Sequence, residues 1–259
     1  GEFSDLAKSM GGSIITLDGS SGIINYLEVF RTAEDEAISF ANHLSKMNSL
    51  YKYLCPSADE PERNEFEEYV RKLYEVKGLW MSNSTEHQQI TGLPPEAYPT
   101  FDDLLELVRS DLYEDFGEHK VNQNLSPYKW RRLENIELTL SNLVNSYGKM
   151  FNGKTSIPDL SDKQIIVYNV QNISTLKPEI FNALLFNVMS LMFDDMIRIG
   201  VPSKQKYESG TPIYQIPKLL LMVDEAHKFI NTKNPLALEY MIGIVREGVH
   251  HGPEKRVAI

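Results

Sequence analysis

The sequence predicts an α/β fold: a mostly parallel β-sheet with an all-helical block inserted between its strands. Strand-like segments lie at 13–17, 165–170 and 219–223, whereas the long stretch 32–150 carries apolar residues at helical spacing. Because strands that alternate with helices pair in parallel through right-handed crossovers, the flanking parts are expected to share one sheet. The expected segments are the two parts of the α/β core, 1–31 and 151–259, and the helical block, 32–150.

Composition is that of an ordinary globular protein with a sizeable core. The chain has 259 residues, of which 42% are hydrophobic and 24% charged, and this mix excludes a largely disordered chain. Its one cysteine, Cys55, excludes a disulfide scaffold and favours a reducing compartment. The longest apolar run, Leu219–Val223, is far too short to span a membrane, and no signal peptide is expected.

Negative charge is concentrated in the helical block. The formal net charge is −10, and residues 31–150 carry 13 Lys and Arg against 21 Asp and Glu, which is −8. This segment is therefore a poor general binder of phosphate backbone, since such affinity grows with the number of neutralised phosphates. A solvated, solubilising surface is the simpler interpretation.

The first predicted strand, Ser13–Leu17, lies in a region, 1–30, that is short and strand-like throughout. It is β-branched and bounded by glycine pairs and turns, Gly11-Gly12 before it and Asp18-Gly19 after it. We expect it to lie in the sheet.

Four helices are predicted in the block 32–150, each with a start signal. The signals are a Thr32–Asp35 capping box, Pro61, a Thr100–Asp103 capping box and Ser126-Pro127, and Gly148 is the expected stop of the fourth helix. Residues 78–99, rich in glycine and proline, are expected to be loop. The predicted buried faces, in chain order, are Ile38, Ala41, Leu44, Met47 and Tyr51; Phe66, Tyr69, Val70, Leu73 and Tyr74; Leu104, Leu107, Val108 and Leu112; and Trp130, Leu133, Ile136, Leu140, Val144 and Tyr147.

The C-terminal part alternates strand and helix. A strand at 165–170 is followed by a helix predicted from Pro178 to Ile199 and stopped by Gly200. The next residues, 201–216, form a polar segment that contains proline and glycine. The apolar run 219–223 then predicts a strand buried on both sides, and a last helix is expected over 234–248.

The most informative chemistry follows the apolar run 219–223. Asp224 and Glu225 come directly after it, at the end of a strand where parallel sheets place ligands. In P-loop nucleotide hydrolases, such an Asp holds the magnesium ion on the phosphates and the next carboxylate activates water. The alternative is an ordinary strand that ends in polar residues. The same position matches the DEAH signature of one class of helicases, with Asp224-Glu225-Ala226-His227, but the other helicase motifs are absent from the sequence.

The matching phosphate-binding motif is missing from the sequence. No G-x-x-x-x-G-K-[ST] pattern occurs, and Gly153-Lys154-Thr155 lacks the first glycine at the required spacing. A second candidate site residue is Arg246, near the end of the last predicted helix. An arginine at this position could reach the γ-phosphate bound by a neighbouring subunit. The alternative is a surface arginine, which is favoured near a helix C-terminus by the helix dipole. His250-His251 lacks a third ligand at suitable spacing, so zinc is rejected.

These residues and their order resemble the VirB-type ATPases of type IV secretion and conjugative transfer, in the HerA/FtsK branch of P-loop motors. The resemblance covers Gly11-Gly12 before a strand, Ile24-Asn25-Tyr26-Leu27 for the family's I-N-P-L, the helical insertion, and Asp224-Glu225-Ala226. Arg246-Glu247-Gly248 matches the start of the closing R-E-G-R-K-x-G motif, although Val249-His250 replaces its Arg-Lys and Tyr26 replaces the usual proline.

The resemblance implies a RecA-like core and a function. The intact protein would hydrolyse ATP, with Asp224 holding magnesium through water, Glu225 activating water, and Arg246 a catalytic candidate. ATP and magnesium would be its cofactors, and the chain, as a fragment that lacks the P-loop, would be inactive and bind neither tightly. Implied partners are other secretion-channel or conjugation proteins and further copies in a hexamer. The implied location is cytoplasmic, at the inner face of the cell membrane through those partners.

Two other functions stay open at this point. A HerA-like or coupling-protein DNA translocase would need a basic, DNA-binding pore, and the acidic block argues against it. A non-catalytic docking module would use the helical block to bind a channel component.

Overall fold

The structure is a computed structural model that describes residues 2–158, 160, 163–218, 220–224 and 242. The chain forms two compact units, 1–185 and 186–259, and the boundary falls inside a long helix, α7 (Pro178–Glu208). The domain boundaries expected at 31/32 and 150/151 remain a prediction.

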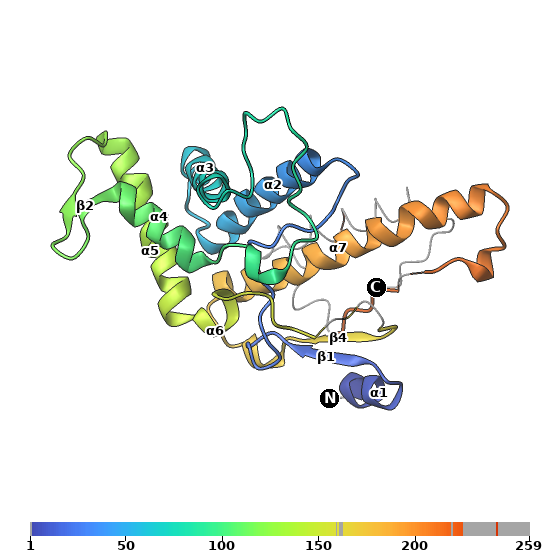
Figure 1. The fold of residues 1–259 in the computed structure, drawn as a ribbon. Coiled ribbons are helices and arrows are strands. Elements are labelled where there is room, and N and C mark those ends of the chain that lie inside the picture. The colour runs from blue at the N-terminus through green and yellow to red at the C-terminus, as the bar shows by residue number, and fades with distance from the viewer. Residues whose placement is uncertain (1, 159, 161–162, 219, 225–241, 243–259) are drawn as a thin grey trace. The chain divides into compact units, whose positions relative to one another are not determined.

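Two strands far apart in the sequence form a parallel pair in the first unit. β1 (Ser13–Thr16) pairs with β4 (Ile166–Asn169) in the register Ser13↔Ile166 to Thr16↔Asn169. The two arrows lie side by side in Figure 1, and all helices from α2 to α6 come between them in the sequence. Gly12 permits the close approach at the start, since a Cβ there would lie 2.8 Å from the Ile165 carbonyl oxygen. The predicted parallel pairing of these two segments is confirmed.

A helix, not a strand, precedes β1. α1 (Glu2–Ser9) packs its buried Ala7 near β1 and ends at Gly11, whose φ is +72°. The strand-like interpretation of the first ten residues was therefore wrong. The apolar residues Phe3, Leu6, Ala7 and Met10 recur at helical spacing, although of these only Ala7 is buried.

The four predicted helices of the block are confirmed. They are α2 (Glu36–Leu54), α3 (Glu60–Val76), α4 (Phe101–Leu112) and α5 (Pro127–Ser146), followed by the short α6 (Gly148–Phe151). Residues 78–99 are loop apart from one 3-10 turn, η1 (Pro95–Ala97). In α4, the Asp103 carboxylate accepts the backbone N–H of Thr100 at 2.8 Å, so the predicted capping pair is present.

The start and face of α2 differ from the prediction. Asp35, not Thr32, caps it, because the Asp35 carboxylate accepts the N–H of Ala37 at 2.7 Å. Ile38 is 53% exposed, and the buried face includes Phe40 and His43. Phe40 packs against Tyr74 and Trp80 with ring centroids 5.1 and 4.9 Å apart, and this large aromatic contact sets the rotation of the helix.

The faces of the other three helices follow the predicted pattern with local shifts. All five predicted positions of α3 are buried. In α4 and α5 the predicted Leu107, Trp130, Val144 and Tyr147 are half-buried, whereas Leu105 and Leu143 are buried. A shift of one residue turns the face by about 100°, which periodicity alone does not resolve within an apolar cluster.

A small hairpin interrupts the helical block. β2 (Tyr113–Asp115) and β3 (Lys120–Val121) pair in antiparallel fashion between α4 and α5. His119 adopts a left-handed conformation with φ 52° at the turn. The sequence does not reveal this hairpin, because its strands are too short to show an alternating pattern.

α7 continues far beyond its predicted stop. It passes through Gly200 and Pro202 and ends only near Gly210, whose φ is +92°. There the N–H of Thr211 donates to the Lys206 carbonyl at 3.0 Å and the N–H of Gly210 to the Tyr207 carbonyl at 3.0 Å, which is a Schellman cap. The predicted stop at Gly200 and polar segment at 201–216 were therefore wrong: a glycine ends a helix only where the chain turns left-handed. A 3-10 turn, η3 (Ile213–Gln215), follows the cap.

Candidate functional site

The carboxyl ends of β1 and β4 meet at one edge of the sheet, where α/β folds place ligands. Thr16 lies opposite Asn169, and the Leu17 N–H donates to the Asn169 carbonyl at 3.2 Å. The chain then turns through Asp18 and Ser20, while a 3-10 turn, η2 (Gln171–Ile173), follows β4. This edge of the first unit is a carboxyl-terminal edge of a parallel strand pair, whereas the sequence predicts the site after the run 219–223.

Asp18 organises this edge. Its carboxylate accepts the hydroxyl and N–H of Ser20 at 2.5 and 2.9 Å and the side-chain amide of Asn172 at 2.7 Å. Hydrogen bonds from the Ser20 hydroxyl, then the Asn172 amide and the Ser20 N–H, lower the pKa of Asp18 from its usual value. A carboxylate held by these donors fixes the loop after β1 against the turn after β4. The pattern Asp18-Gly19 predicts only a turn, because Asp18 acquires its role from Asn172, 154 positions further along the chain.

Of the three predicted site residues, one lies in the described part of the chain. Asp224 is exposed and sits in a turn, whereas Glu225 and Arg246 lie outside the described residues, as does nearly all of the predicted helix 234–248.

The segment before Asp224 does not form the predicted buried strand. Residues 220–223 have no strand pairing, and Leu220 and Met222 are 64% and 63% exposed. A buried strand needs hydrogen-bonding neighbours for its backbone. Within the described residues, β1 and β4 pair only with each other, and no third strand joins them. Apolar composition alone is therefore not enough to make residues 220–223 a strand.

No group of three His, Cys, Asp or Glu side chains within the described ranges converges as a metal-binding set. Asp224 is thus a single exposed carboxylate there. The assignment of ATP and magnesium rests on the sequence pattern.

Gly153-Lys154-Thr155 has a structural role. The Lys154 ammonium donates to the Tyr98 carbonyl, and the Thr155 hydroxyl accepts the Asn25 N–H at 3.0 Å and donates to Glu28. These contacts join the segment to Tyr98 and to the 23–28 stretch.

The Ile24-Asn25-Tyr26-Leu27 segment is buried at the centre of the first unit. Asn25 donates its side-chain amide to the Pro99 carbonyl at 2.9 Å. The Tyr26 ring stacks on Phe151 at 5.1 Å and contacts Phe101 at 5.6 Å. The Tyr26 hydroxyl donates to the Ala183 carbonyl in α7 at 3.3 Å. The Tyr26 side chain, which stands where the pattern I-N-P-L has proline, thus fills the space between the helical block and the first part of α7.

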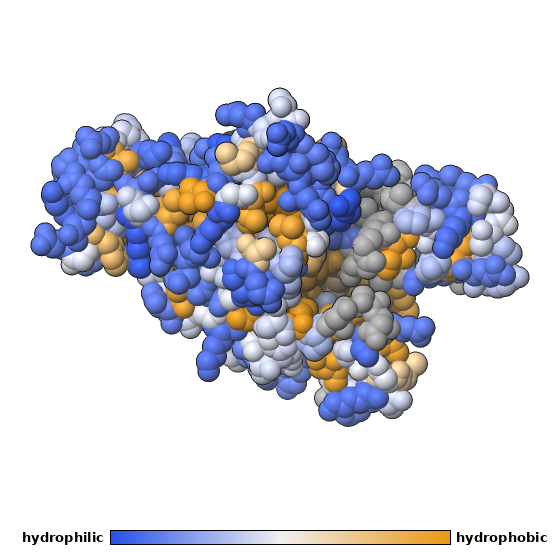
Figure 2. Space-filling model, in the orientation of Figure 1, coloured by the Kyte–Doolittle hydropathy of each residue, from blue (hydrophilic) through white to orange (hydrophobic). Residues whose placement is uncertain are grey.

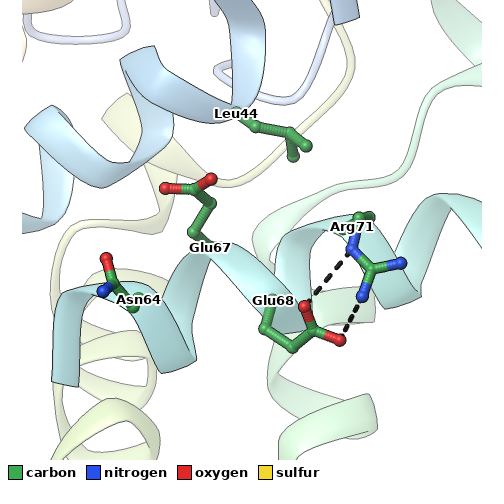
Figure 3. Close-up of a pocket in the computed structure, with 5 residues that line it drawn as sticks. All are labelled: Leu44, Asn64, Glu67, Glu68 and Arg71. Carbon is green, nitrogen blue, oxygen red and sulfur yellow. Dashed lines mark hydrogen bonds and ion pairs between the residues drawn. The ribbon is translucent and has the colours of Figure 1, made fainter. Parts of the chain in front are cut away.

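A surface hollow of about 220 Å³ lies between α2 and α3 (Figure 3). Its polar lining is already paired: Asn48 donates to Asn64 at 3.2 Å and to Glu67 at 2.9 Å, and Arg71 pairs with Glu68. The polar side chains that line the hollow are thus already engaged by other side chains, and we assign no site to it.

Comparison with known proteins gives the fold. No protein-family model matches the chain. It is 28% identical over 261 aligned residues to an uncharacterized protein of Bacillus anthracis, pXO2-09, an alignment that covers 95% of this chain and 39% of that protein. The chain thus spans about two-fifths of the length of the curated relative that it matches.

A solved structure covers nearly the whole chain. The structure of VirB4 of Thermoanaerobacter pseudethanolicus superposes with a TM-score of 0.70, covering 96% of this chain and 80% of that one at 17% sequence identity. The fold is VirB4-like. At this identity the likeness establishes the fold alone, and it agrees with the predicted α/β class and with the family resemblance.

No helix in the described part of the chain is long and apolar enough to cross a membrane.

Proposed function

We propose that this chain is part of an ATP-hydrolysing motor that powers type IV secretion or conjugative transfer. The observation that carries the proposal is the VirB4-like fold, which extends over 96% of the chain. The Asp224-Glu225 pair after an apolar run and the Ile24-Asn25-Tyr26-Leu27 segment support it independently from the sequence.

The proposed roles follow the sequence pattern. Asp224 would hold a magnesium ion through water, Glu225 would activate the attacking water, and Arg246 would stabilise charge on the phosphates of a neighbouring subunit. Proposed partners are other secretion-channel or conjugation proteins and further copies of the protein in a hexameric ring. The proposed location is the cytoplasmic face of the cell membrane, reached through those partners.

The decisive experiment replaces the predicted base. In the complete protein that contains this chain, Glu225→Gln should lower ATP turnover by about a hundredfold or more and abolish transfer, because it removes proton abstraction from water. Glu208→Gln is the matched control: Glu208 is exposed on α7, and its replacement should leave turnover unchanged.

A second candidate function is a docking module that binds a channel component. The excess of acidic residues in 31–150, 21 against 13 basic ones, favours it. It predicts that Glu225→Gln leaves both ATP turnover and transfer at the level of the unaltered protein, and that result would overturn the motor proposal. A salt-dependent gel shift with DNA would point instead to a translocase that binds nucleic acid.

A further inference from the structure

The hairpin between α4 and α5 carries a cluster of aromatic rings on the surface. Phe116 is 41% exposed, and the rings of Tyr113 and His119 lie 5.3 and 5.6 Å from its ring and 6.1 Å from each other. Hydrophilic side chains cover most of this end of the helical block, on the left in Figure 2. We name this surface the aromatic hairpin; its residues are Tyr113, Asp115, Phe116, Glu118 and His119.

His119 contributes its ring to this cluster at a cost in backbone energy. Its φ of 52° lies in the left-handed region, which glycine adopts more easily than any residue with a side chain. The imidazole ring is exposed and stands nearly perpendicular to the Phe116 ring, at 86°. An exposed ring gains little from burial, so the turn itself does not require histidine at this position.

The Phe116 ring already contacts one cation, whose charge is neutralised inside the protein. The Arg109 guanidinium lies 4.2 Å from the ring centroid. Its charge is balanced by Glu137, a carboxylate 8% exposed and 2.7 Å away. The exposed part of the Phe116 ring therefore faces no net positive charge from Arg109, and the electron-rich ring is able to attract a second cation.

Two carboxylates beside the rings have no ion pair within the described part of the chain. Glu114 is paired with Lys120 at 2.6 Å, so it is not available to a partner. Asp115 and Glu118 are exposed, and the Asp115 carboxylate accepts the Glu118 N–H at 3.1 Å, which fixes the turn. With three acids and one lysine, residues 113–121 carry a formal charge of −2 that the Glu114–Lys120 pair leaves unbalanced.

We propose that the aromatic hairpin binds an arginine-bearing, basic segment of a different protein. A guanidinium is planar and weakly hydrated, so it stacks on an aromatic ring while its N–H groups remain available to carboxylates. On this surface the exposed part of the Phe116 ring would take the plane of the guanidinium, and Asp115 and Glu118 would accept its hydrogen bonds.

Charge complementarity decides the class of partner. A polyanion such as nucleic acid is repelled by a hairpin of charge −2 on a chain of charge −10. A second copy of the chain, with the same charge of −10, is a weaker candidate than a basic protein for the same reason. The proposal goes beyond the proposed ATPase function and needs no nucleotide, so either one can fail without the other.

A fluorescently labelled peptide of alternating arginine and glycine tests the proposal. Its fluorescence anisotropy, measured without nucleotide at about 50 mM NaCl, should give a dissociation constant of about 100 µM for the unaltered chain, and binding should weaken about tenfold at about 300 mM. Phe116→Leu should weaken binding about threefold, because leucine keeps an apolar contact but has no aromatic ring.

The two carboxylates are tested together. Asp115→Asn with Glu118→Gln should weaken peptide binding about fivefold. The amide at position 115 keeps an oxygen that can accept the Glu118 N–H, so the turn should be retained. Glu34→Gln with Glu86→Gln is the matched control: it removes the same charge at exposed positions outside the hairpin, and it should bind the peptide like the unaltered chain.

Three results would overturn the proposal. The first is binding of the peptide by the unaltered chain weaker than about 1 mM. The second is equal binding by the unaltered chain and either hairpin variant, or an equal loss in the control, which would mean that only the net charge of the chain attracts the peptide. The third is self-association of the unaltered chain, seen by sedimentation velocity without peptide and abolished in both hairpin variants, which would assign the surface to a second copy.

Discussion

Buried polar side chains hold distant segments of the first unit together. Glu36, 7% exposed, accepts the N–H groups of Ile90 and Thr91 at 2.8 Å each and the Thr91 hydroxyl at 2.7 Å. Burial raises the pKa of Glu36, but these donors together with Arg31 more than offset it, and the pKa is lowered. One carboxylate thereby holds residues 90 and 91 of the long loop 78–99 against the first turn of α2.

His43 gives the stability of the protein a dependence on pH. Its Nε2 lies 2.9 Å from the Tyr74 hydroxyl in a fully enclosed site, and burial, with a smaller contribution from Lys46, lowers its pKa from 6.5 to about 3. As pH falls below 6.5, the unfolded chain gains a proton at this position that the folded chain does not take up. The free energy of unfolding should therefore decrease from about pH 6 toward pH 3.

Replacing His43 by leucine should remove this dependence. We expect the slope of unfolding free energy against pH, measured with urea between about pH 6 and pH 4, to be about 1.4 kcal/mol per pH unit smaller in His43→Leu than in the unaltered chain. Leu104→Ala, at a fully buried position, is the control: it should lower stability at every pH and keep the slope. Equal slopes in His43→Leu and the unaltered chain would contradict the prediction.

At the scale of elements, helix starts and helix ends obey different rules. Helix starts follow local signals. The Ser126 hydroxyl accepts the backbone N–H of Lys129 at 3.3 Å, and the Asp59 carboxylate accepts that of Glu62 at 2.8 Å. Gly210, which adopts a positive φ just after α7, sets the end of that helix. Gly200 lies within the helix without ending it, since glycine permits a left-handed turn and does not impose one.

Gly210→Ala should loosen the α7 cap. Nothing lies within 4 Å of an added Cβ, so the cost is the left-handed backbone alone, about 1 kcal/mol. Hydrogen exchange at the Thr211 amide, which donates to the Lys206 carbonyl, should accelerate about fivefold. Gly210→Asn should have a smaller effect, because asparagine tolerates this conformation. Identical exchange in the alanine and asparagine variants would show that the cap does not depend on φ.

At the scale of the whole molecule, we expect the 259-residue chain to bind ATP only weakly. Its sequence contains no G-x-x-x-x-G-K-[ST] motif, whose backbone N–H groups, lysine and hydroxyl supply most of the affinity for phosphates. Isothermal titration calorimetry with ATP and magnesium should give a dissociation constant weaker than about 1 mM. Binding at that level or tighter would mean that other residues of this chain hold the phosphates.

Features encoded within a few neighbouring residues were predicted from the sequence. The α/β class, the pairing segments around Ser13–Thr16 and Ile166–Asn169, and four helices with most of their start signals belong to this group. Capping, proline position and apolar period act over one or two turns, which is why a single sequence carries them.

Features that depend on distant partners were decided by the tertiary structure. The face of α2 follows from the packing of Phe40 on Tyr74, and Asp18 acquires its role from Asn172. The apolar segment 220–223, which composition assigns to a buried strand, lacks a pairing strand among the described residues, and its Leu220 and Met222 side chains are exposed. Composition records which residues avoid water, but a strand, a helix face and an ion-holding loop each require a second segment, and only the folded chain supplies it.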